Sequence, residues 1–443
     1  MRSRNQASRE KISADQLASI TAEFDQVGAP FGFGMSAALL PMSAHRAMAE
    51  CVGAFIDGAD ALISGIGNDP ARLASVLRVP EHEAGLWNAL PPADWALSGR
   101  PDLLIQGSRV VLIDANFGPL AALFPLNDVL LRAHRGLAAR PFFDCPGVPR
   151  FVMGTYADLL RRQVVPHAQR VVVTYFAEED KDGPTSYGWS YRCQADELSR
   201  LGLPARVAHA EEIDASSSGT YCAGERVGLV HRFFLPPDPA IPSEVTAFAG
   251  LREAAWSGAS GVFTGFRGDV FASKAMIAAL SDERYAEQMP TALASRLAQA
   301  IPWTRVLEER STLVDGSRID LVPWTADNRD RLVLKGARGY AGLETVIGCQ
   351  VSHNVWEDVI NRAVGGEPWV VQEFIIPDYR PLLVADPSGD LSQLRLPVVY
   401  GAFVLDRHFA GAICRYGIQG AENLNINGHY GAIPVPVYWT AGD

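Results

Sequence analysis

The sequence of 443 residues lacks several features that would assign it to a class at once. Its six cysteines are widely separated, with no C-x-x-C pair, which argues against a zinc or redox motif and favours a reduced, cytoplasmic compartment. It has no run of about 18 apolar residues, so we expect no membrane span, and its N-terminal stretch is too polar for a secretory signal. Lys and Arg number 39 against 50 Asp and Glu, and this net charge of −11 argues against nucleic acid as a partner.

Common catalytic motifs are absent as well. The sequence contains no P-loop G-x-x-x-x-G-K-[ST], no zinc-protease H-E-x-x-H and no G-x-S-x-G nucleophile elbow. The histidines show no metal-ligand spacing. These absences exclude the P-loop enzymes and the best-marked hydrolases, while a local basic groove for a nucleotide triphosphate stays compatible with the composition.

What is present is a globular pattern in three predicted domains, rich enough in apolar residues (48%) for a large core. Apolar residues at three- and four-residue steps predict a mostly helical region over residues 1–98. Alternating strand and helix patterns predict a small α/β domain with a partly parallel sheet over residues 99–245. An α+β pattern follows over residues 246–443, in which residues 376–395 are expected to form an exposed loop.

The first polar cluster is expected on a β-hairpin. A turn around Gly107 predicts that residues 102–105 pair with residues 109–114. Folding about this turn sets residue 102 opposite about 112, with residue 114 as its diagonal neighbour on the same face. Two carboxylates and an amide oxygen would then converge, and such hard oxygen ligands suit Mg²⁺. Alternatively, these side chains only shape the turn that closes the hairpin. The candidate metal ligands are Asp102, Asp114 and Asn116.

The second candidate is a Gly-rich segment after a predicted strand. The strand ends in Lys335, and glycines let the following backbone approach a ligand closely, so exposed N–H groups and the lysine can hold phosphate oxygens. An ordinary hairpin loop explains the glycines equally well. The loop candidates are Gly336, Arg338, Gly339 and Gly342.

Two later strands add further candidates. The apolar run at 369–375 ends where the backbone could offer N–H and C=O groups to an adenine edge, although by itself it indicates only a buried strand. Its candidate residues are Gln372, Glu373, Phe374 and Ile375. Arg415, in a predicted strand near the end, could face a transferring phosphate or a substrate carboxylate, or it could be a solvated strand residue.

Taken in chain order, these segments resemble the circularly permuted ATP-grasp ligases, the group that includes glutathionylspermidine synthetase. The family's early metal hairpin, D-x(11)-[ED]-x-N, is matched by Asp102, Asp114 and Asn116, with Asp at 114 one methylene shorter than the usual Glu. Its S-[NS]-K-A helix start is matched by residues 272–275, and its strand lysine by Lys335. Its V-x-Q-E-[FY] hinge is matched by residues 370–374, and its late strand pair ends here at Arg415.

The resemblance covers roughly residues 100–435 and implies a circularly permuted ATP-grasp fold, of mixed α+β and α/β class, with a helical N-terminal region. It also implies an ADP-forming carboxylate–amine ligase that uses ATP and Mg²⁺ and makes an amide or peptide bond through an acyl phosphate. Small amino-acid-like carboxylates and amines are the implied substrates, and natural-product assembly is one implied setting. The oligomeric state is left open.

The resemblance implies roles for individual residues. Lys274 and Lys335 would contact phosphates, residues 372–375 would frame adenine, and the loop 336–342 would close as a lid. Arg415 would stabilise the transferred phosphoryl group. Arg267 is a candidate for the substrate carboxylate, with a structural salt bridge as its alternative. Two rival functions stay open: a small-molecule kinase that uses the same site, and a nucleotide-binding protein whose catalytic parts have decayed.

Overall fold

The computed structural model describes residues 34–92, 94–120, 123–138, 147–166, 168–180, 188–338, 344–385, 390–417, 424–426 and 430–441, together with residues 15, 18, 21 and 22. Within these ranges no helix is both long enough and apolar enough to cross a membrane.

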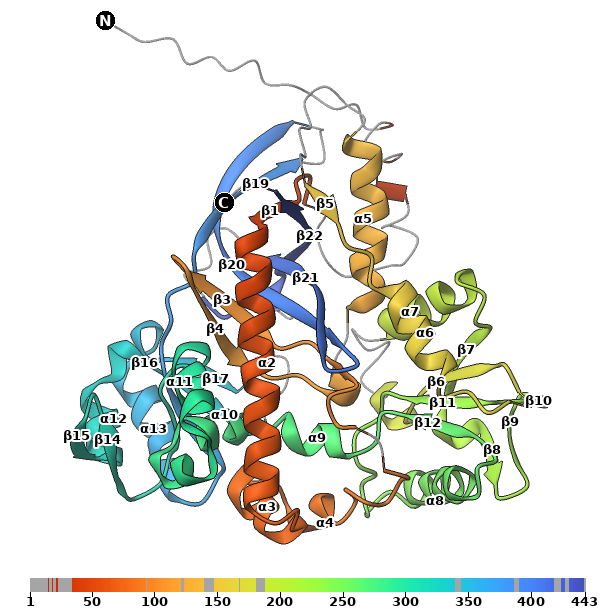
Figure 1. Ribbon diagram of the computed structural model, residues 1–443, viewed down its shortest axis with the longest axis horizontal. Coiled ribbons are helices and arrows are strands. Elements are labelled where there is room, and N and C mark those ends of the chain that lie inside the picture. The colour runs from red at the N-terminus through yellow and green to blue at the C-terminus, as the bar shows by residue number, and fades with distance from the viewer. Residues whose placement is uncertain are drawn as a thin grey trace, which may run out of the picture.

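A large sheet forms the centre of the molecule, with the strand order β1-β22-β21-β20-β3-β4 (Figure 1). Three short or peripheral strands, β2, β5 and β19, pair with its members. The strands are β1 (Ala38–Pro41), β2 (Ser98–Gly99), β3 (Asp102–Gln106), β4 (Arg109–Asp114), β5 (Val148–Pro149), β19 (Tyr379–Ala385), β20 (Leu391–Leu405), β21 (His408–Tyr416) and β22 (Ile433–Thr440).

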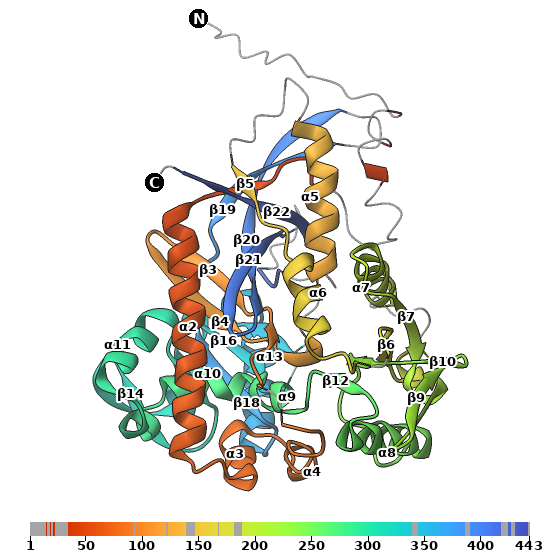
Figure 2. The same ribbon diagram turned by 45° about the vertical axis from the view of Figure 1, so that its right-hand side comes forward.

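A long N-terminal helix, α2 (Met42–Gly65), runs along this sheet (Figures 1 and 2). Its buried residues recur at helical spacing, as Met48, Val52, Phe55 and Leu62 do, and they share one hydrophobic core with the sheet. Two short helices follow, α3 (Pro70–Leu77) and α4 (Glu81–Ala84). The helical pattern predicted for this region is therefore confirmed over its described part.

A second sheet is fully parallel, with the order β12-β11-β6-β7. The Val171–Tyr175 strand is buried on both faces: Val171 and Val173 pack against one group of helices, and Val172 packs against α8. The sequence predicted a partly parallel sheet here, and all of the strand pairs in this sheet are parallel. The elements here are β6 (Val171–Tyr175), β7 (Ala205–His209), β11 (Leu229–Arg232) and β12 (Gly261–Phe263), the helices α5 (Phe124–Ala138), α6 (Met153–Arg161), α7 (Gly188–Arg200) and α8 (Pro242–Ser257), and a small sheet of β8 (Ile213–Ser216), β9 (Gly219–Cys222) and β10 (Glu225–Arg226).

A third sheet is small, with the order β13-β18-β16-β17, and its paired strands are antiparallel. One face packs on α12 and α13, and the other meets α10 through Val306, Val370 and Ala337. The elements are β13 (Thr304–Val306), β14 (Ser311–Val314), β15 (Ser317–Asp320), β16 (Leu332–Gly336), β17 (Thr345–Ile347), β18 (Trp369–Glu373), α9 (Arg267–Phe271), α10 (Lys274–Ser281), α11 (Thr291–Ala300), α12 (Leu321–Asp327) and α13 (His353–Val364). Short 3-10 helices are η1 (Gly118–Leu120), η2 (Ala177–Asp180), η3 (Ala210–Glu212), η4 (Glu283–Gln288), η5 (Arg329–Arg331) and η6 (Gly348–Gln350).

The exposed loop predicted at 376–395 is wrong for most of that segment. β19 pairs with the first half of β20 over residues 379–385 and 391–397. Leu382 and Leu396 are buried in the hydrophobic core that the sheet shares with α2. The Pro, Ser and Gly residues at 387–389, which contributed to the loop prediction, lie outside the described residues, whereas Pro381 lies within β19. Pro381 pairs with Arg395 in the β19–β20 ladder, so this proline did not mark a loop.

The three predicted domains contribute to one hydrophobic core. It includes Phe55 from the first, Leu112 from the second and Ile277 from the third. Because this core includes residues from all three predicted domains, it marks no domain boundary at residue 98 or 245. The division at these positions stays a prediction.

Candidate functional site

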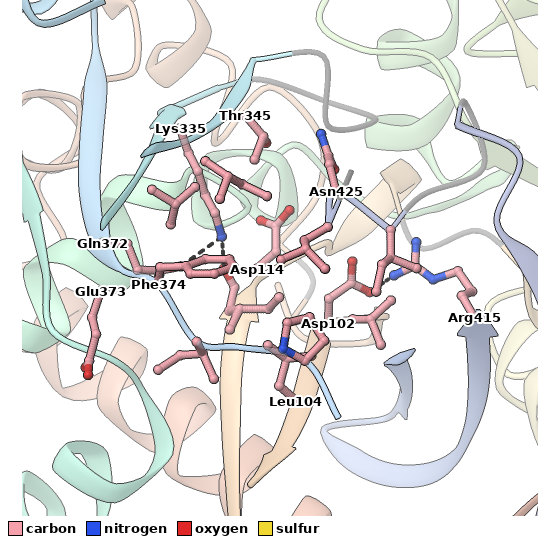
Figure 3. A pocket seen from close by; sticks show the side chains of 18 of the residues that line it. Asp102, Leu104, Asp114, Lys335, Thr345, Gln372, Glu373, Phe374, Arg415 and Asn425 are labelled. Carbon is pink, nitrogen blue, oxygen red and sulfur yellow. Dashed lines mark hydrogen bonds and ion pairs between the residues drawn. The ribbon is translucent and has the colours of Figure 1, made fainter. Parts of the chain in front are cut away.

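A cavity lies between the central sheet and the small antiparallel sheet, where β3 and β4 face β16 and β18 (Figure 3). Polar side chains gather at one part of it and apolar side chains line the rest. The lining residues are Arg100, Asp102, Leu104, Ile113, Asp114, Asn116, Val333, Lys335, Thr345, Ile347, Gln372, Glu373, Phe374, Ile375, Pro377, Val399, Arg415, Leu424, Asn425 and Ile426.

The acidic hairpin differs from its prediction in register. The turn lies at Gly107, which has a φ of +60°, but the strands pair one position away from the predicted register, with Gln106 opposite Arg109 and Leu103 opposite Leu112. There one extra residue, Ile113, forms a bulge, so that Asp102 pairs directly with Asp114. The predicted diagonal offset is therefore wrong, since the shifted register and the bulge each advance the pairing by one position and together place Asp114 opposite Asp102.

Two arginines converge on Asp102. Arg100 Nη1 lies 3.1 Å and Arg415 Nη2 lies 2.6 Å from the same oxygen, Asp102 Oδ1. Arg415 is only 7% exposed, yet neither its Nε nor its Nη2 makes an aligned hydrogen bond to the described residues, so the contact with Asp102 is an ion pair alone. A buried guanidinium with spare donors is well suited to bind an anionic group.

Two lysines flank Asp114. Lys274, the first residue of α10, follows the capping residue Ser273 and places its Nζ 3.4 Å from Asp114 Oδ1. Burial opposes the charged form of Asp114, but the charges of Lys274 and Lys335 outweigh it and lower the pKa of this carboxyl below its usual range. Asp114 is therefore ionised at neutral pH.

Lys335 lies at the centre of the site, at the end of β16. Its Nζ donates to the Ile113 carbonyl at 2.7 Å and to Gln372 Oε1 at 2.8 Å. Burial lowers the pKa of Lys335 to about 8, with Lys274 acting in the same direction and Asp114 opposing it. The lysine still carries its charge at pH 7 but loses it within a mildly alkaline range.

The four residues predicted to frame adenine, Gln372 to Ile375, differ in where their side chains lie. Gln372 points its side chain to Lys335 rather than to the apolar part of the cavity. The N–H groups of Glu373 and Phe374 donate to the carbonyls of Trp303 and Arg331, and the exposed Glu373 carboxylate points away from the acidic pair (Figure 3). Ile375 and the side chain of Phe374 line the cavity itself.

The predicted Gly-rich loop is only partly within the described residues. Gly339 and Gly342 lie outside them. Gly336 pairs with Trp369, and a Cβ there would come within 2.0 Å of Glu344 Oε2, so close packing accounts for this glycine. Arg338 forms an ion pair with Glu83 of α4 and does not line the cavity.

Arg267 is not brought to the cavity. Its guanidinium packs over the Trp87 ring, 4.9 Å from the centroid. Burial lowers the pKa of Arg267, and the carboxylates of Asp94 and Asp60 act against that shift. Arg267 forms no ion pair with the described residues and its buried Nε has no hydrogen-bond partner among them, so the structure shows packing on Trp87 and not the salt bridge offered as the alternative.

Several residues that line the cavity were not among the candidates predicted from the sequence. Arg100 was open to detection, because it lies two residues before Asp102 and strand side chains alternate between faces. Thr345 pairs with Lys335 across the β16–β17 connection, and Asn425 comes from a distant segment. No local pattern connects these last two residues to the acidic hairpin.

The donor set fits a divalent cation. Asp102, Asp114 and Asn116 offer carboxylate and amide oxygens, and Asp114 is kept ionised. No group of three His, Cys, Asp or Glu side chains within the described ranges has the arrangement of a metal site, so a cation here would take its remaining ligands from a substrate or water. Without a metal, four cations face two carboxylates: Arg100, Arg415, Lys274 and Lys335 against Asp102 and Asp114. The site is thus locally positive in a protein with a net charge of −11.

Comparisons with known proteins rest on structure alone, since no family model and no curated protein matches the sequence. A glutathione synthetase-like effector from Globodera pallida, solved in its apo form, aligns with a TM-score of 0.61 at 11% identity, covering 98% of this chain and 99% of that chain. D-alanyl-alanine synthetase A from Vibrio cholerae aligns with a TM-score of 0.29 at 8% identity over 61% of this chain and 88% of its own. The ATP-grasp ligase PsnB, solved with a minimal precursor, Mg and ADP, aligns with a TM-score of 0.28 at 12% identity over 62% and 89%.

The last two alignments are too weak to carry an argument. The first extends over nearly the whole of both chains and, at its low identity, shows a shared fold and nothing about activity. The predicted mixed α/β class is confirmed: this chain has the fold of the glutathione synthetase-like effector.

Proposed function

We propose that the protein is an ATP-dependent, ADP-forming carboxylate–amine ligase of the circularly permuted ATP-grasp type, related to the glutathionylspermidine synthetase group. The observation that carries the proposal is the locally positive cavity, in which the paired carboxylates Asp102 and Asp114 are surrounded by Lys274, Lys335 and the two arginines. A triphosphate with a divalent cation complements this charge pattern.

The cavity offers separate places for the two ends of ATP. Lys335 and Lys274 would neutralise phosphate oxygens, since Lys274 forms an ion pair with Asp114 and the charge of Lys335 also acts on this carboxylate. The apolar part, lined by Val333, Ile347 and Ile375, would hold the adenine ring. The Ile375 N–H makes no hydrogen bond to the described residues and is therefore open to an adenine nitrogen, whereas the N–H groups of Glu373 and Phe374 are not.

Mg²⁺ would be held by Asp102, Asp114 and Asn116. When bound, it neutralises negative charge on the β- and γ-phosphates. Arg100, Arg415 and Lys274, which now pair with these carboxylates, would be available to phosphate oxygens wherever a carboxylate held the metal instead.

The reaction needs no protein nucleophile, in keeping with the absence of nucleophile motifs. A carboxylate oxygen of the acid substrate attacks the γ-phosphorus, an O–P bond forms, and the bond to the ADP oxygen breaks. The amine nitrogen then attacks the acyl carbon, the C–N bond forms, phosphate leaves, and the nitrogen loses a proton. Arg415 would stabilise the phosphoryl group during transfer, because its spare donors lie at the acidic end of the cavity.

Small amino-acid-like carboxylates and amines are the proposed substrates, with a specialised pathway such as natural-product assembly as the setting and the cytoplasm as the compartment. A screen of acids and amines in pairs, read by ADP release and product mass, tests the proposal. ADP and phosphate should form only when both substrates are present, and Lys335→Met should abolish their formation. A stable phosphorylated product without amine would identify a kinase instead, and release of AMP would overturn the acyl-phosphate route.

A further inference from the structure

A buried row of hydrogen bonds leads away from Lys335. Lys335 Nζ donates to Gln372 Oε1 at 2.8 Å, and Gln372 Nε2 donates to Thr304 Oγ1 at 3.1 Å. The Thr304 hydroxyl donates in turn to the Pro302 carbonyl at 3.0 Å. Lys335, Gln372 and Thr304 are 7%, 2% and 0% exposed, so the row is largely shielded from bulk solvent.

The chemistry of the two ends fixes the direction of every bond between them. An ammonium can only donate, and a carbonyl oxygen can only accept. A reversed Gln372 amide would turn its NH₂ group toward the Lys335 ammonium, placing two donors together, and its oxygen toward a hydroxyl proton already given to Pro302. Only one orientation of the amide therefore satisfies the whole row.

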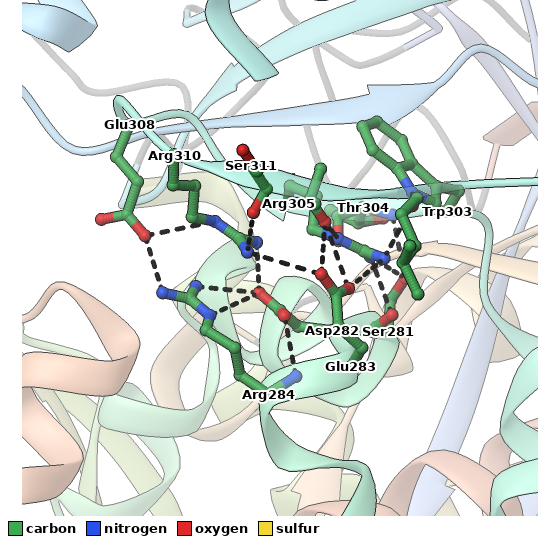
Figure 4. Close-up of polar contacts among 12 residues, drawn as sticks. Ser281, Asp282, Glu283, Arg284, Trp303, Thr304, Arg305, Glu308, Arg310 and Ser311 are labelled. Atoms are coloured by element: carbon green, nitrogen blue, oxygen red, sulfur yellow. Dashed lines mark hydrogen bonds and ion pairs between the residues drawn. The ribbon is translucent and has the colours of Figure 1, made fainter. Parts of the chain in front are cut away.

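Thr304 is firmly fixed at its end of the row. It pairs directly with Gln372 between β13 and β18, and its N–H donates to Ser281 Oγ at 3.0 Å. The neighbouring Arg305 also donates to Ser281 Oγ, at 2.9 Å, and forms an ion pair with Glu283 at 2.9 Å (Figure 4). These contacts tie the strand that carries the hydroxyl to the end of α10, whose first residue is Lys274.

We propose that Thr304 is a positioning residue for Lys335: its hydroxyl fixes the Gln372 amide with Oε1 toward the ammonium, and so keeps the lysine charged for phosphate binding. The assignment of a phosphate ligand to Lys335 rests on the proposed function, but the effect on the lysine itself does not. Burial already lowers the pKa of Lys335 to about 8 with this acceptor in place. Loss of a well-oriented acceptor disfavours the charged form further, so the lysine becomes neutral at lower pH.

The test compares Thr304→Val, which removes the hydroxyl at nearly constant shape, with Thr304→Ser, which keeps it. The titration of Lys335 is followed without nucleotide by the NMR signal of ¹³C-labelled lysine, assigned by its loss in Lys335→Met. We expect a midpoint near that of the wild type in Thr304→Ser and a lower one in Thr304→Val. An unchanged midpoint in a folded Thr304→Val protein would overturn the proposal. If the valine variant does not fold, Thr304→Ala removes the same hydroxyl and takes its place.

ATP affinity provides the second readout. If the midpoint falls by one unit, the ratio of wild-type to Thr304→Val affinity should rise from about one at pH 6 to about tenfold at pH 9. A purely structural role for Thr304 would change affinity equally at both pH values, which contradicts the proposal. If the midpoint shifts but the wild type does not bind ATP, the positioning role stands and the proposed function fails.

Discussion

Asp102 and Asp114 lie directly opposite each other across β3 and β4, because the extra residue Ile113 bulges from the second strand. One carboxylate faces two arginines and the other faces two lysines. The pair thus divides the neighbouring cations into two groups, one at each carboxylate, and this arrangement can be tested one charge at a time.

Neutralising Asp114 should separate metal-dependent from metal-free binding. Asp114→Asn keeps the side-chain shape but removes a metal ligand and adds one positive charge to the site. We expect affinity for Mg·ATP to fall at least about tenfold, while affinity for ATP in the presence of a chelator does not fall. Calorimetric titration with and without Mg²⁺ measures both, with Asp158→Asn at an exposed pair on α6 as the matched control. Equal losses under the two conditions would show that Asp114 does not act through a metal.

The alkaline limit of ATP binding should be set by Lys335. Because the pKa of Lys335 is about 8, its charge is lost as the pH rises through that value, and ATP affinity should decline between pH 7.5 and 9.5. Lys335→Arg keeps its charge throughout this range and should show a flatter profile. Binding measured across the range decides the point, and parallel wild-type and arginine profiles would speak against the assignment.

The same lysine predicts a rise in stability with pH in the unliganded protein. Its pKa is lowered in the folded state, from 10.5 to about 8, so between these values the unfolded chain holds a proton that the folded chain lacks. The free energy of unfolding therefore increases with pH in this window. Urea denaturation at pH 7.5 and 9.5 should show a larger increase in the free energy of unfolding for the wild type than for Lys335→Met. The variant serves as the control because it lacks only this titratable group.

Removing the guanidinium of Arg415 should affect turnover more than ATP binding. Its spare donors are placed for charge that develops during phosphoryl transfer, and loss of such a group typically costs about 10²-fold or more in kcat. Arg415→Met should lower kcat by that order with a smaller change in the KM for ATP. Similar changes in both constants would instead indicate a ground-state binding role.

A polar network apart from the cavity should govern stability rather than activity. Asp282 has a side chain 1% exposed and accepts from Arg284 and Arg310 at the start of η4 (Figure 4). Asp282→Ala leaves these cations without their partner and should reduce the free energy of unfolding by about 3 kcal/mol. Asp330→Ala, at a pair with a 76% exposed carboxylate, should change it by less than about 1 kcal/mol. Chemical denaturation of both variants measures the contrast.

Local patterns in the sequence identified those elements whose residues interact with near neighbours. The turn at Gly107, the valine-rich strand Val171–Tyr175 and the helix His353–Val364 follow from turn chemistry and from periods of two and 3.6 residues. The acidic pair was open to the same reasoning, because both residues belong to one hairpin.

Features that depend on distant parts of the chain were beyond such patterns. No residue pattern in the sequence indicates the bulge at Ile113. Lys335 donates to the Ile113 carbonyl although the two residues are 222 positions apart in the chain. Thr304 and Gln372 are 68 residues apart and meet only because β13 and β18 pair. Arg267 seemed well placed by its order in the chain, yet packing on Trp87 directs it elsewhere.

Binding of Mg·ATP in the cavity between the acidic hairpin and β16 can be tested without knowing either substrate. Calorimetric titration of Mg·ATP into the wild type and into folded Lys335→Met measures it most directly. We expect saturable, Mg²⁺-dependent binding to the wild type that is at least about tenfold weaker in the variant. Equal affinities, or no binding of Mg·ATP to the folded wild type, would contradict it.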